Sequence, residues 1–131
     1  MILPLYPHIA HRSSPIPDIE RTVSESHPLV RGNRAVVFRM RRRWRPACVI
    51  VVEISRRLQR LCELDLVGGE NPLIAEIKAA VARAVADQHG LTATQVILAS
   101  PGAIPRDALN ATDRPACWRI FFRRHVDDAE V

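Results

Sequence analysis

The sequence predicts a small α+β domain, in which about three helices pack on a three-stranded sheet that includes a β-hairpin. Two β-rich runs lie close together at Ala35–Met40 and Ala47–Ile54. A long alanine-rich run with helical periodicity occupies Pro72–His89, and a short apolar run follows at Gln95–Ser100. The 131 residues, 47% of them hydrophobic and 25% charged, suffice for one domain with a core but not for two.

The N-terminal part of the chain is rich in proline, and we expect residues 1–11 to form an irregular arm. A short helix should follow, because Ile19 and Val23 recur at helical spacing behind Pro17, a residue that suits a first helical turn. Pro28 should end this helix, because proline cannot continue the hydrogen-bond pattern.

The hairpin is predicted from the two β-rich runs, of which Ala47–Ile54 is apolar on both faces and should therefore be central in the sheet. Five arginines fall between positions 39 and 45 and give the hairpin a basic tip: Arg39, Arg41, Arg42, Arg43 and Arg45. Most basic turns of this kind are simply solvated. The functional alternative is a surface that docks an acidic partner. Nucleic-acid binding is not favoured, because Trp44 is a single aromatic residue and not a stacking platform.

The second half of the chain predicts helix, strand and helix in that order. Ser55–Asn71 is charged and then glycine-rich, which leaves room for a helical turn before a loop. Pro72–His89 repeats its apolar residues at three- and four-residue steps, and Gly90 stands where a left-handed C-cap belongs. Gln95–Ser100 should form a strand, and Arg114–Arg124 a terminal amphipathic helix.

Composition also bears on where in the cell the protein is expected. No apolar run reaches the roughly 18 residues of a membrane-spanning helix, and the apolar N-terminus lacks the basic flank of a signal peptide. We therefore expect a cytoplasmic protein. The three cysteines, Cys48, Cys62 and Cys117, are widely spaced, form no CxxC pair, and should be reduced and mostly buried.

Spacing alone identifies no catalytic or metal-binding group. The chain has no G-x-S-x-G element, no phosphate-binding glycine loop and no metal-ligand spacing of cysteine or histidine. His27 and His89 fall at predicted helix ends, where capping of exposed carbonyls is the expected role. Lys78 is the only lysine among 19 basic residues, so any reaction that requires an ammonium group has one candidate.

Three stretches together resemble the C-terminal domain of fatty-acyl-AMP ligases, which belong to the adenylate-forming superfamily. They are Arg12–Pro28 (RSSPIPDIE, then a helix ending in His-Pro), the hairpin with the strand VIVVEI, and Ile77–Arg106. The last is the most specific, because it combines a helix ending in His-Gly, a strand and the pattern Pro-Gly-x-x-Pro-Arg. The resemblance runs from Arg12 to Arg124. It implies a domain at residues 12–126 and a tail at 127–131.

The resemblance also implies a lid that closes over an active site, with a loop that continues as Thr-Ser-Ser-Gly-Lys. An alignment without gaps places Asn110 on that glycine and Ala111 on the lysine, while Arg114 keeps its place. In the family the lysine bridges the acyl carboxylate and the α-phosphate of ATP, so this chain is expected to contribute no catalytic residue. The residues expected to face the active site are Pro105, Arg106, Asn110, Ala111 and Arg114, with Arg106 as the nearest cation. An ordinary surface loop is the alternative.

Cofactors and partners follow from the same resemblance. No motif of the nucleotide pocket, the Mg²⁺ site or the acyl tunnel occurs in these residues. ATP and Mg²⁺ are thus implied only for a complete ligase, and we expect the isolated chain to be a truncated, degenerate and inactive lid. The expected partner is an N-terminal adenylation domain acting in trans. The alternatives are a non-catalytic module that binds an acyl carrier protein through the arginine run, and self-association through apolar lid surface.

Overall fold

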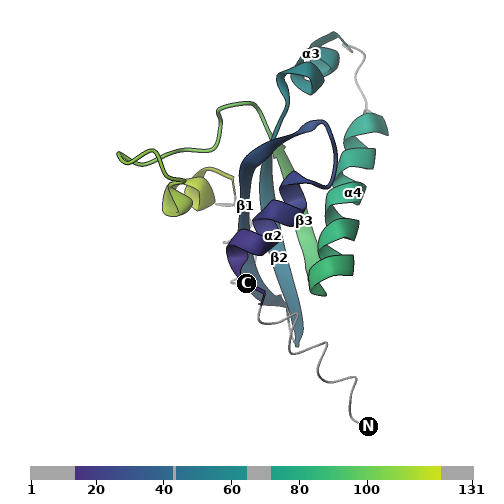
Figure 1. Ribbon diagram of the computed structural model, residues 1–131, viewed down its shortest axis with the longest axis vertical. Coiled ribbons are helices and arrows are strands. Elements are labelled where there is room, and N and C mark those ends of the chain that lie inside the picture. The colour runs from purple at the N-terminus through teal and green to yellow at the C-terminus, as the bar shows by residue number, and fades with distance from the viewer. Residues whose placement is uncertain (1–13, 43, 65–71, 122–131) are drawn as a thin grey trace.

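The computed structural model describes residues 14–42, 44–64 and 72–121, and within them it confirms a small α+β domain. Described strands β1 and β2 form an antiparallel hairpin, and β3 runs parallel to β2, so the described sheet has three strands in the order β1-β2-β3 (Figure 1). A further helix covers residues 114–121. The labelled elements are α2 (Ile16–Ser24), β1 (Val30–Arg42), β2 (Arg45–Ile54), α3 (Arg56–Leu64), α4 (Pro72–His89) and β3 (Thr92–Ala99).

Strand β2 is the centre of the sheet, as its composition predicts. It is hydrogen-bonded to β1 on one side and to β3 on the other, and its residues from Ala47 to Ile54 are all buried. Because both faces of β2 are covered, the strand lacks the polar alternation of a sheet that faces water on one side.

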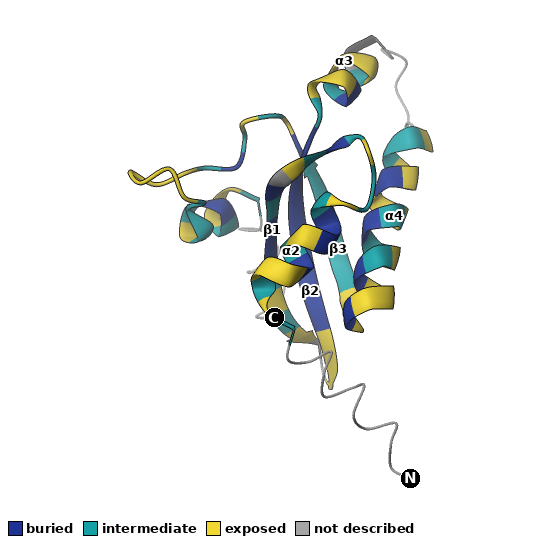
Figure 2. Ribbon diagram, in the orientation of Figure 1, coloured by how far each residue is buried: buried dark blue, intermediate teal, exposed yellow. Residues whose placement is uncertain are grey.

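The two faces of the sheet are covered by different parts of the chain. Helices α2 and α4 pack on one face through residues such as Ile19 and Val81, and the buried Leu58 of α3 belongs to the same core. The loop after β3 and the helix at 114–121 pack on the other face through Ile104 and Cys117. Figure 2 shows buried residues between the layers, and Figure 1 shows α4 and the 114–121 helix on opposite sides of the sheet.

The predicted boundaries need several corrections. The hairpin strands are longer than the predicted runs, because β1 continues past Met40 and β2 begins before Ala47, so that Arg41 and Arg45 lie in strands and not in a turn. The antiparallel pairing extends to Arg42 opposite Arg45, because an exposed pair of strands tolerates long charged side chains. Helix α3 has nine residues where one turn was expected.

Other predictions agree with the structure. Helix α4 has the predicted limits, and Gly90 takes a φ of 66°, the left-handed C-cap conformation. The cysteines are free, with Cys48 and Cys117 buried and Cys62 half-buried. The predicted arm at residues 1–11, the loop at Gly68-Gly69 and the tail at 127–131 lie outside the described residues. Among the described helices, none has the length and apolar character needed to cross a membrane.

The predicted capping role of the two histidines is wrong. The Nε2 atom of His89 lies 2.7 Å from the hydroxyl of Thr22, and its Nδ1 atom lies 3.1 Å from that of Ser14. His27 accepts a hydrogen bond from the backbone N–H of Leu29 at its Nδ1 atom and pairs with Glu76 through Nε2 at 3.1 Å. His89 thus joins α4 to Thr22 of α2, and His27, in the segment after α2, joins that segment to Glu76 of α4.

Candidate functional site

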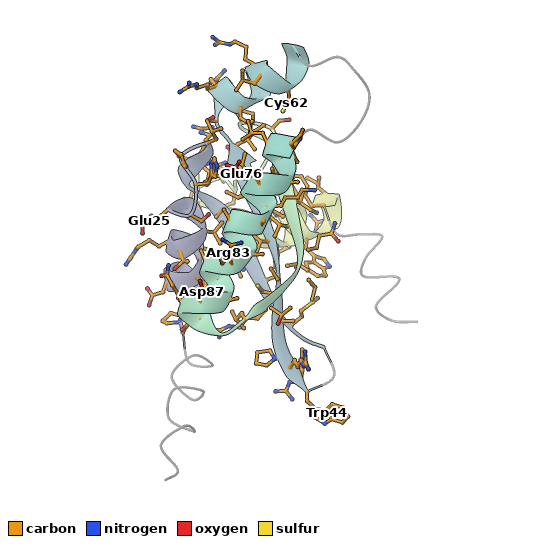
Figure 3. All side chains as sticks on the ribbon, turned by 90° about the vertical axis from the view of Figure 1, so that its right-hand side faces the viewer. Glu25, Trp44, Cys62, Glu76, Arg83 and Asp87 are labelled. Carbon is orange, nitrogen blue, oxygen red and sulfur yellow. The ribbon has the colours of Figure 1, made fainter. Side chains whose placement is uncertain are left out.

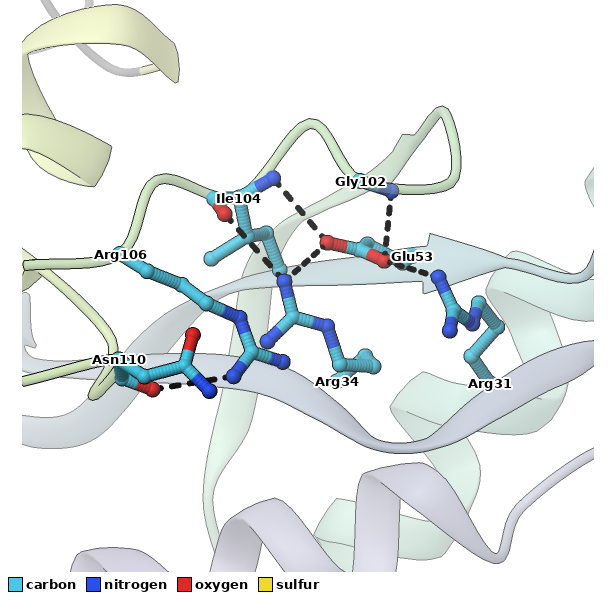
Figure 4. Close-up of polar contacts among 7 residues, drawn as sticks. All are labelled: Arg31, Arg34, Glu53, Gly102, Ile104, Arg106 and Asn110. Carbon is cyan, nitrogen blue, oxygen red and sulfur yellow. Dashed lines mark hydrogen bonds and ion pairs between the residues drawn. The ribbon is translucent and has the colours of Figure 1, made fainter.

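A buried glutamate organises the end of the sheet from which the candidate loop leaves. Glu53 stands near the end of β2 and its side chain is fully buried. Its two carboxylate oxygens pair with two arginines of β1, Arg34 at 2.6 Å and Arg31 at 3.0 Å (Figure 4). Arg34 is itself buried, whereas Arg31 is partly exposed. A charge in this position requires such partners, because burial without them is strongly unfavourable.

The same carboxylate holds the loop that follows β3. It accepts the backbone N–H of Gly102 at 2.9 Å and that of Ile104 at 3.1 Å, and Arg34 donates to the carbonyl of Ile104. Burial acts to raise the pKa of Glu53, but hydrogen bonds from Arg34 and the two amides, with the arginine charge, hold it below its usual range. Each oxygen of Glu53 thus has two donors, and the loop is fixed to the sheet at this point.

Beyond this anchor the loop closes on itself. Arg106 and Thr112 form an isolated antiparallel bridge, and the backbone N–H of Asp107 donates to the carbonyl of Ala111 at 2.8 Å. The carboxylate of Asp107 accepts the N–H groups of Leu109 at 2.9 Å and Ala111 at 3.0 Å. These bonds make residues 107–111 a compact turn that projects from the body of the domain.

The turn has one residue in the left-handed conformation, Asn110, with a φ of 67°. Glycine adopts this conformation most readily, and asparagine is among the few other residues that tolerate it. The position is the one that the family resemblance aligns with a glycine. The guanidinium of Arg106 crosses the base of the turn and donates to the carbonyl of Asn110 at 3.0 Å.

A second anchor lies where the loop enters the 114–121 helix. Asp113 caps the helix by accepting the N–H of Ala116 at 3.1 Å. Arg114 pairs with Glu20 at 2.8 Å, donates to the carbonyl of Val37, and lies over the ring of Phe38, 4.9 Å from its centroid. Arg114 therefore joins the helix to α2 and β1.

The structure brings together four of the five loop residues that the sequence singled out: Pro105, Arg106, Asn110 and Ala111. The last three are exposed. Arg114 is directed instead toward α2 and β1. Lys78 belongs to α4, which packs on the opposite face of the sheet, so its ammonium group is not near this loop.

Sequence reasoning missed the group that holds the loop. Glu53 is the only charged residue in the buried strand from Ala47 to Ile54, and an acid inside such a run is a signal that it has buried partners. The role of Asp107 was also missed. In the structure its carboxylate accepts two backbone amides within the turn.

The two buried cysteines, Cys48 and Cys117, are not candidates for nucleophilic chemistry. Burial raises the pKa of Cys48 and that of Cys117 to about 11 each. Both thiols are therefore protonated near neutral pH, and a thiol is a much weaker nucleophile than a thiolate.

The arginine run lies at the other end of the hairpin. Arg39, Arg41 and Arg45 are exposed, and Trp44 at the turn is 88% exposed. Arg43 and the side chain of Arg42 lie outside the described residues. Because Arg45 opens β2 and Glu53 stands near its end, the two candidate surfaces are separated by the length of the strand.

Comparisons with known proteins support the resemblance. No protein-family model matches the chain. The chain is 27% identical over 114 residues to the medium-chain-fatty-acid–[acyl-carrier-protein] ligase JamA of Moorena producens, a match that covers 87% of this chain and 18% of that ligase. The solved structure of an ATP-bound RpMatB–BxBclM chimera is similar in fold, with a TM-score of 0.52, 14% identity, and coverage of 82% of this chain and 18% of the chimera. The chain thus spans about a fifth of each relative.

Proposed function

We propose that this chain is a lid-like module of a fatty-acid-activating ligase, which packs over the active site of an adenylation domain but supplies no catalytic charge there. The proposal is supported by the similarity to a medium-chain fatty acid ligase over most of the chain. It is also supported by the loop at residues 105–114, which is anchored at both ends and exposes Ala111 in its turn.

The chemistry explains why this position matters. In fatty acid activation the carboxylate oxygen of the acid attacks the α-phosphorus of ATP. An acyl–phosphate bond forms, the bond between the α- and β-phosphates breaks, and pyrophosphate leaves. Negative charge on both reactants must be neutralised, and a positioned cation contributes several kcal/mol to such a step. The methyl group of Ala111 contributes no charge.

The left-handed conformation of Asn110 is the main structural support for aligning this loop with the family's Gly-Lys pair. The resemblance places a glycine there and a lysine directly after it. Glycine adopts a left-handed backbone most readily, so the conformation of Asn110 fits the aligned glycine. Arg106 is the cation nearest to this turn, and its guanidinium donates a hydrogen bond to the carbonyl of Asn110. It therefore lies across the base of the turn and not at its end.

The test restores the missing charge. Acyl-adenylate formation is measured with ATP, Mg²⁺, a medium-chain fatty acid and the adenylation domain of the similar ligase without its own C-terminal part. Five preparations are compared: the wild-type chain alone, that domain alone, and that domain with the wild-type chain, with Ala111→Lys or with Ala108→Lys. We expect Ala111→Lys to raise the rate by at least about tenfold over the wild-type mixture, because a correctly placed donor is worth that much or more.

The control separates position from charge. Ala108 is exposed in the same turn, so Ala108→Lys adds the same charge without placing it on the aligned position. Equal rates for the two lysine variants would show that net charge, not this position, is responsible. Acyl-adenylate formation by the wild-type chain alone would refute the proposed inactivity. Failure of every variant to change the rate of the adenylation domain would argue against the lid role.

A further inference from the structure

The end of the β1–β2 hairpin has a composition that the proposed function does not use. We define the hairpin tip as Arg39, Arg41, Trp44 and Arg45. All four residues are exposed, and the indole of Trp44 is 88% exposed, an unusual position for the largest apolar side chain. Figure 3 shows Trp44 at the far end of the hairpin, directed away from the helices and the rest of the sheet.

The hairpin tip also lacks neutralising charge. The sequence contains no aspartate or glutamate from Ser26 to Val52. The next acid along the chain is Glu53, which is buried at the opposite end of β2 and already paired with Arg31 and Arg34. Among the described residues, none of the ion pairs involves the hairpin tip. The tip therefore presents exposed positive charge around one exposed aromatic ring.

We propose that the hairpin tip docks the protein on the surface of an anionic phospholipid bilayer. Tryptophan favours the boundary between water and acyl chains, where its ring is buried and its N–H remains hydrated. Guanidinium groups beside it would contact lipid phosphates, to which arginine binds in a planar, two-pronged geometry. Because the tip offers one aromatic residue and no apolar helix face, docking is peripheral and reversible.

The shape of the tip favours a bilayer over other acidic partners. A specific protein interface buries about 800 Å² on each side, which a few residues at the end of a hairpin do not provide alone. Single-stranded nucleic acid is held by several aromatic rings on which successive bases stack, and the tip has one. A flat, laterally mobile lipid surface needs only a projecting group with the right charge and one interfacial side chain.

The first measurement is co-sedimentation with vesicles at low ionic strength, using equal parts of phosphatidylglycerol and phosphatidylcholine, and phosphatidylcholine alone. We expect the wild-type chain to bind the anionic vesicles only, and to be released by high salt. The triple variant Arg39→Ala, Arg41→Ala, Arg45→Ala should lose at least about tenfold in affinity. The matched control, Arg56→Ala, Arg57→Ala, Arg60→Ala, removes the same charge from exposed positions of α3 and should bind like wild type.

The second measurement follows the indole itself. Anionic vesicles should shift the tryptophan emission of the wild-type chain to shorter wavelength, because the ring of Trp44 leaves water. Trp44→Phe should abolish this shift. The remaining Trp118 is half-buried against Phe38, with ring centroids 5.0 Å apart, and should not respond. Circular dichroism of each variant confirms that it is folded.

Three results would overturn the proposal. The first is absence of co-sedimentation with anionic vesicles. The second is an equal loss of binding in the two triple variants, which would mean that total charge and not the hairpin tip is responsible. The third is binding to an acyl carrier protein that the tip variant abolishes, without any binding to vesicles. That outcome would assign the surface to an acidic protein.

Discussion

Arginines stand at both ends of the β1–β2 hairpin, and they do different things there. At one end, Arg31 and Arg34 surround the carboxylate of Glu53 and join the hairpin to the loop after β3. At the other end, Arg39 and Arg41 of the same strand are exposed to solvent. The residue type and the strand are the same. What differs is whether a carboxylate lies within reach and whether water is excluded, and these two conditions decide if an arginine is structural or available for binding.

The difference should be large in energetic terms. Removing one member of a buried ion pair leaves an unpaired charge inside the protein and commonly costs about 3–5 kcal/mol. Exposed charges contribute little to stability, and substitutions at such positions usually change it by less than about 0.5 kcal/mol. Each of the following predictions tests one side of this contrast.

The largest effect is expected for Glu53→Gln. The change preserves the shape of the side chain but removes the negative charge that balances Arg34. It also replaces one carboxylate oxygen with an NH₂ group, which cannot accept a hydrogen bond, so that part of the donors now bound to Glu53 lose their acceptor. We expect the free energy of unfolding, measured in urea, to fall by about 3–5 kcal/mol. Glu76→Gln, at an exposed acid of α4, is the matched control and should cost less than about 0.5 kcal/mol. Similar values for the two would contradict the assigned role of Glu53.

A smaller effect is expected from acid. The pKa of Glu53 is held below its ordinary value of 4.5 in the folded protein. Its carboxylate therefore adds stability that is fully present above pH 4.5 and is lost as the pH falls through the lower, folded-state pKa. Urea unfolding across this acidic range should show the loss in the wild type. The Glu53→Gln variant lacks this carboxylate and should lose less stability over the same range. Parallel curves for the two proteins would argue against the depressed pKa.

The smallest effect on stability is expected at the hairpin tip. The triple variant Arg39→Ala, Arg41→Ala, Arg45→Ala should change the free energy of unfolding by no more than about 0.5 kcal/mol per substitution, while it weakens vesicle binding by at least about tenfold. Thermal unfolding without lipid provides the measurement. A stability loss as large as that of Glu53→Gln would show that these arginines, like Arg34, support the fold.

The sequence was sufficient for helix α4 and for the central strand. The three- and four-residue apolar steps of Pro72–His89 located α4 within its observed limits, because a single amphipathic helix carries its period in its own residues. The continuous apolar run of β2 likewise indicated a central strand. The hairpin ends were predicted less well, since Arg41 and Arg42 continue β1 through backbone pairing that local composition does not specify.

The site was predicted in part. The motif order placed Pro105, Arg106, Asn110 and Ala111 in one loop, and the left-handed Asn110 agrees with the aligned glycine. Arg114 was assigned to the same surface, but its pairing with Glu20 depends on a residue 94 positions away in the sequence. The histidines were misassigned for the same reason, because the partner of His89 on α2 is 67 residues distant.

The sequence by itself determined the class of the fold, the alanine at the turn and the acid-free run of arginines, because each is a property of consecutive residues. Only the tertiary structure decided which arginines are neutralised. A charge acquires its role from the groups around it, and Glu53 reaches Arg31, Arg34 and the loop after β3 only once the sheet has brought these distant segments together.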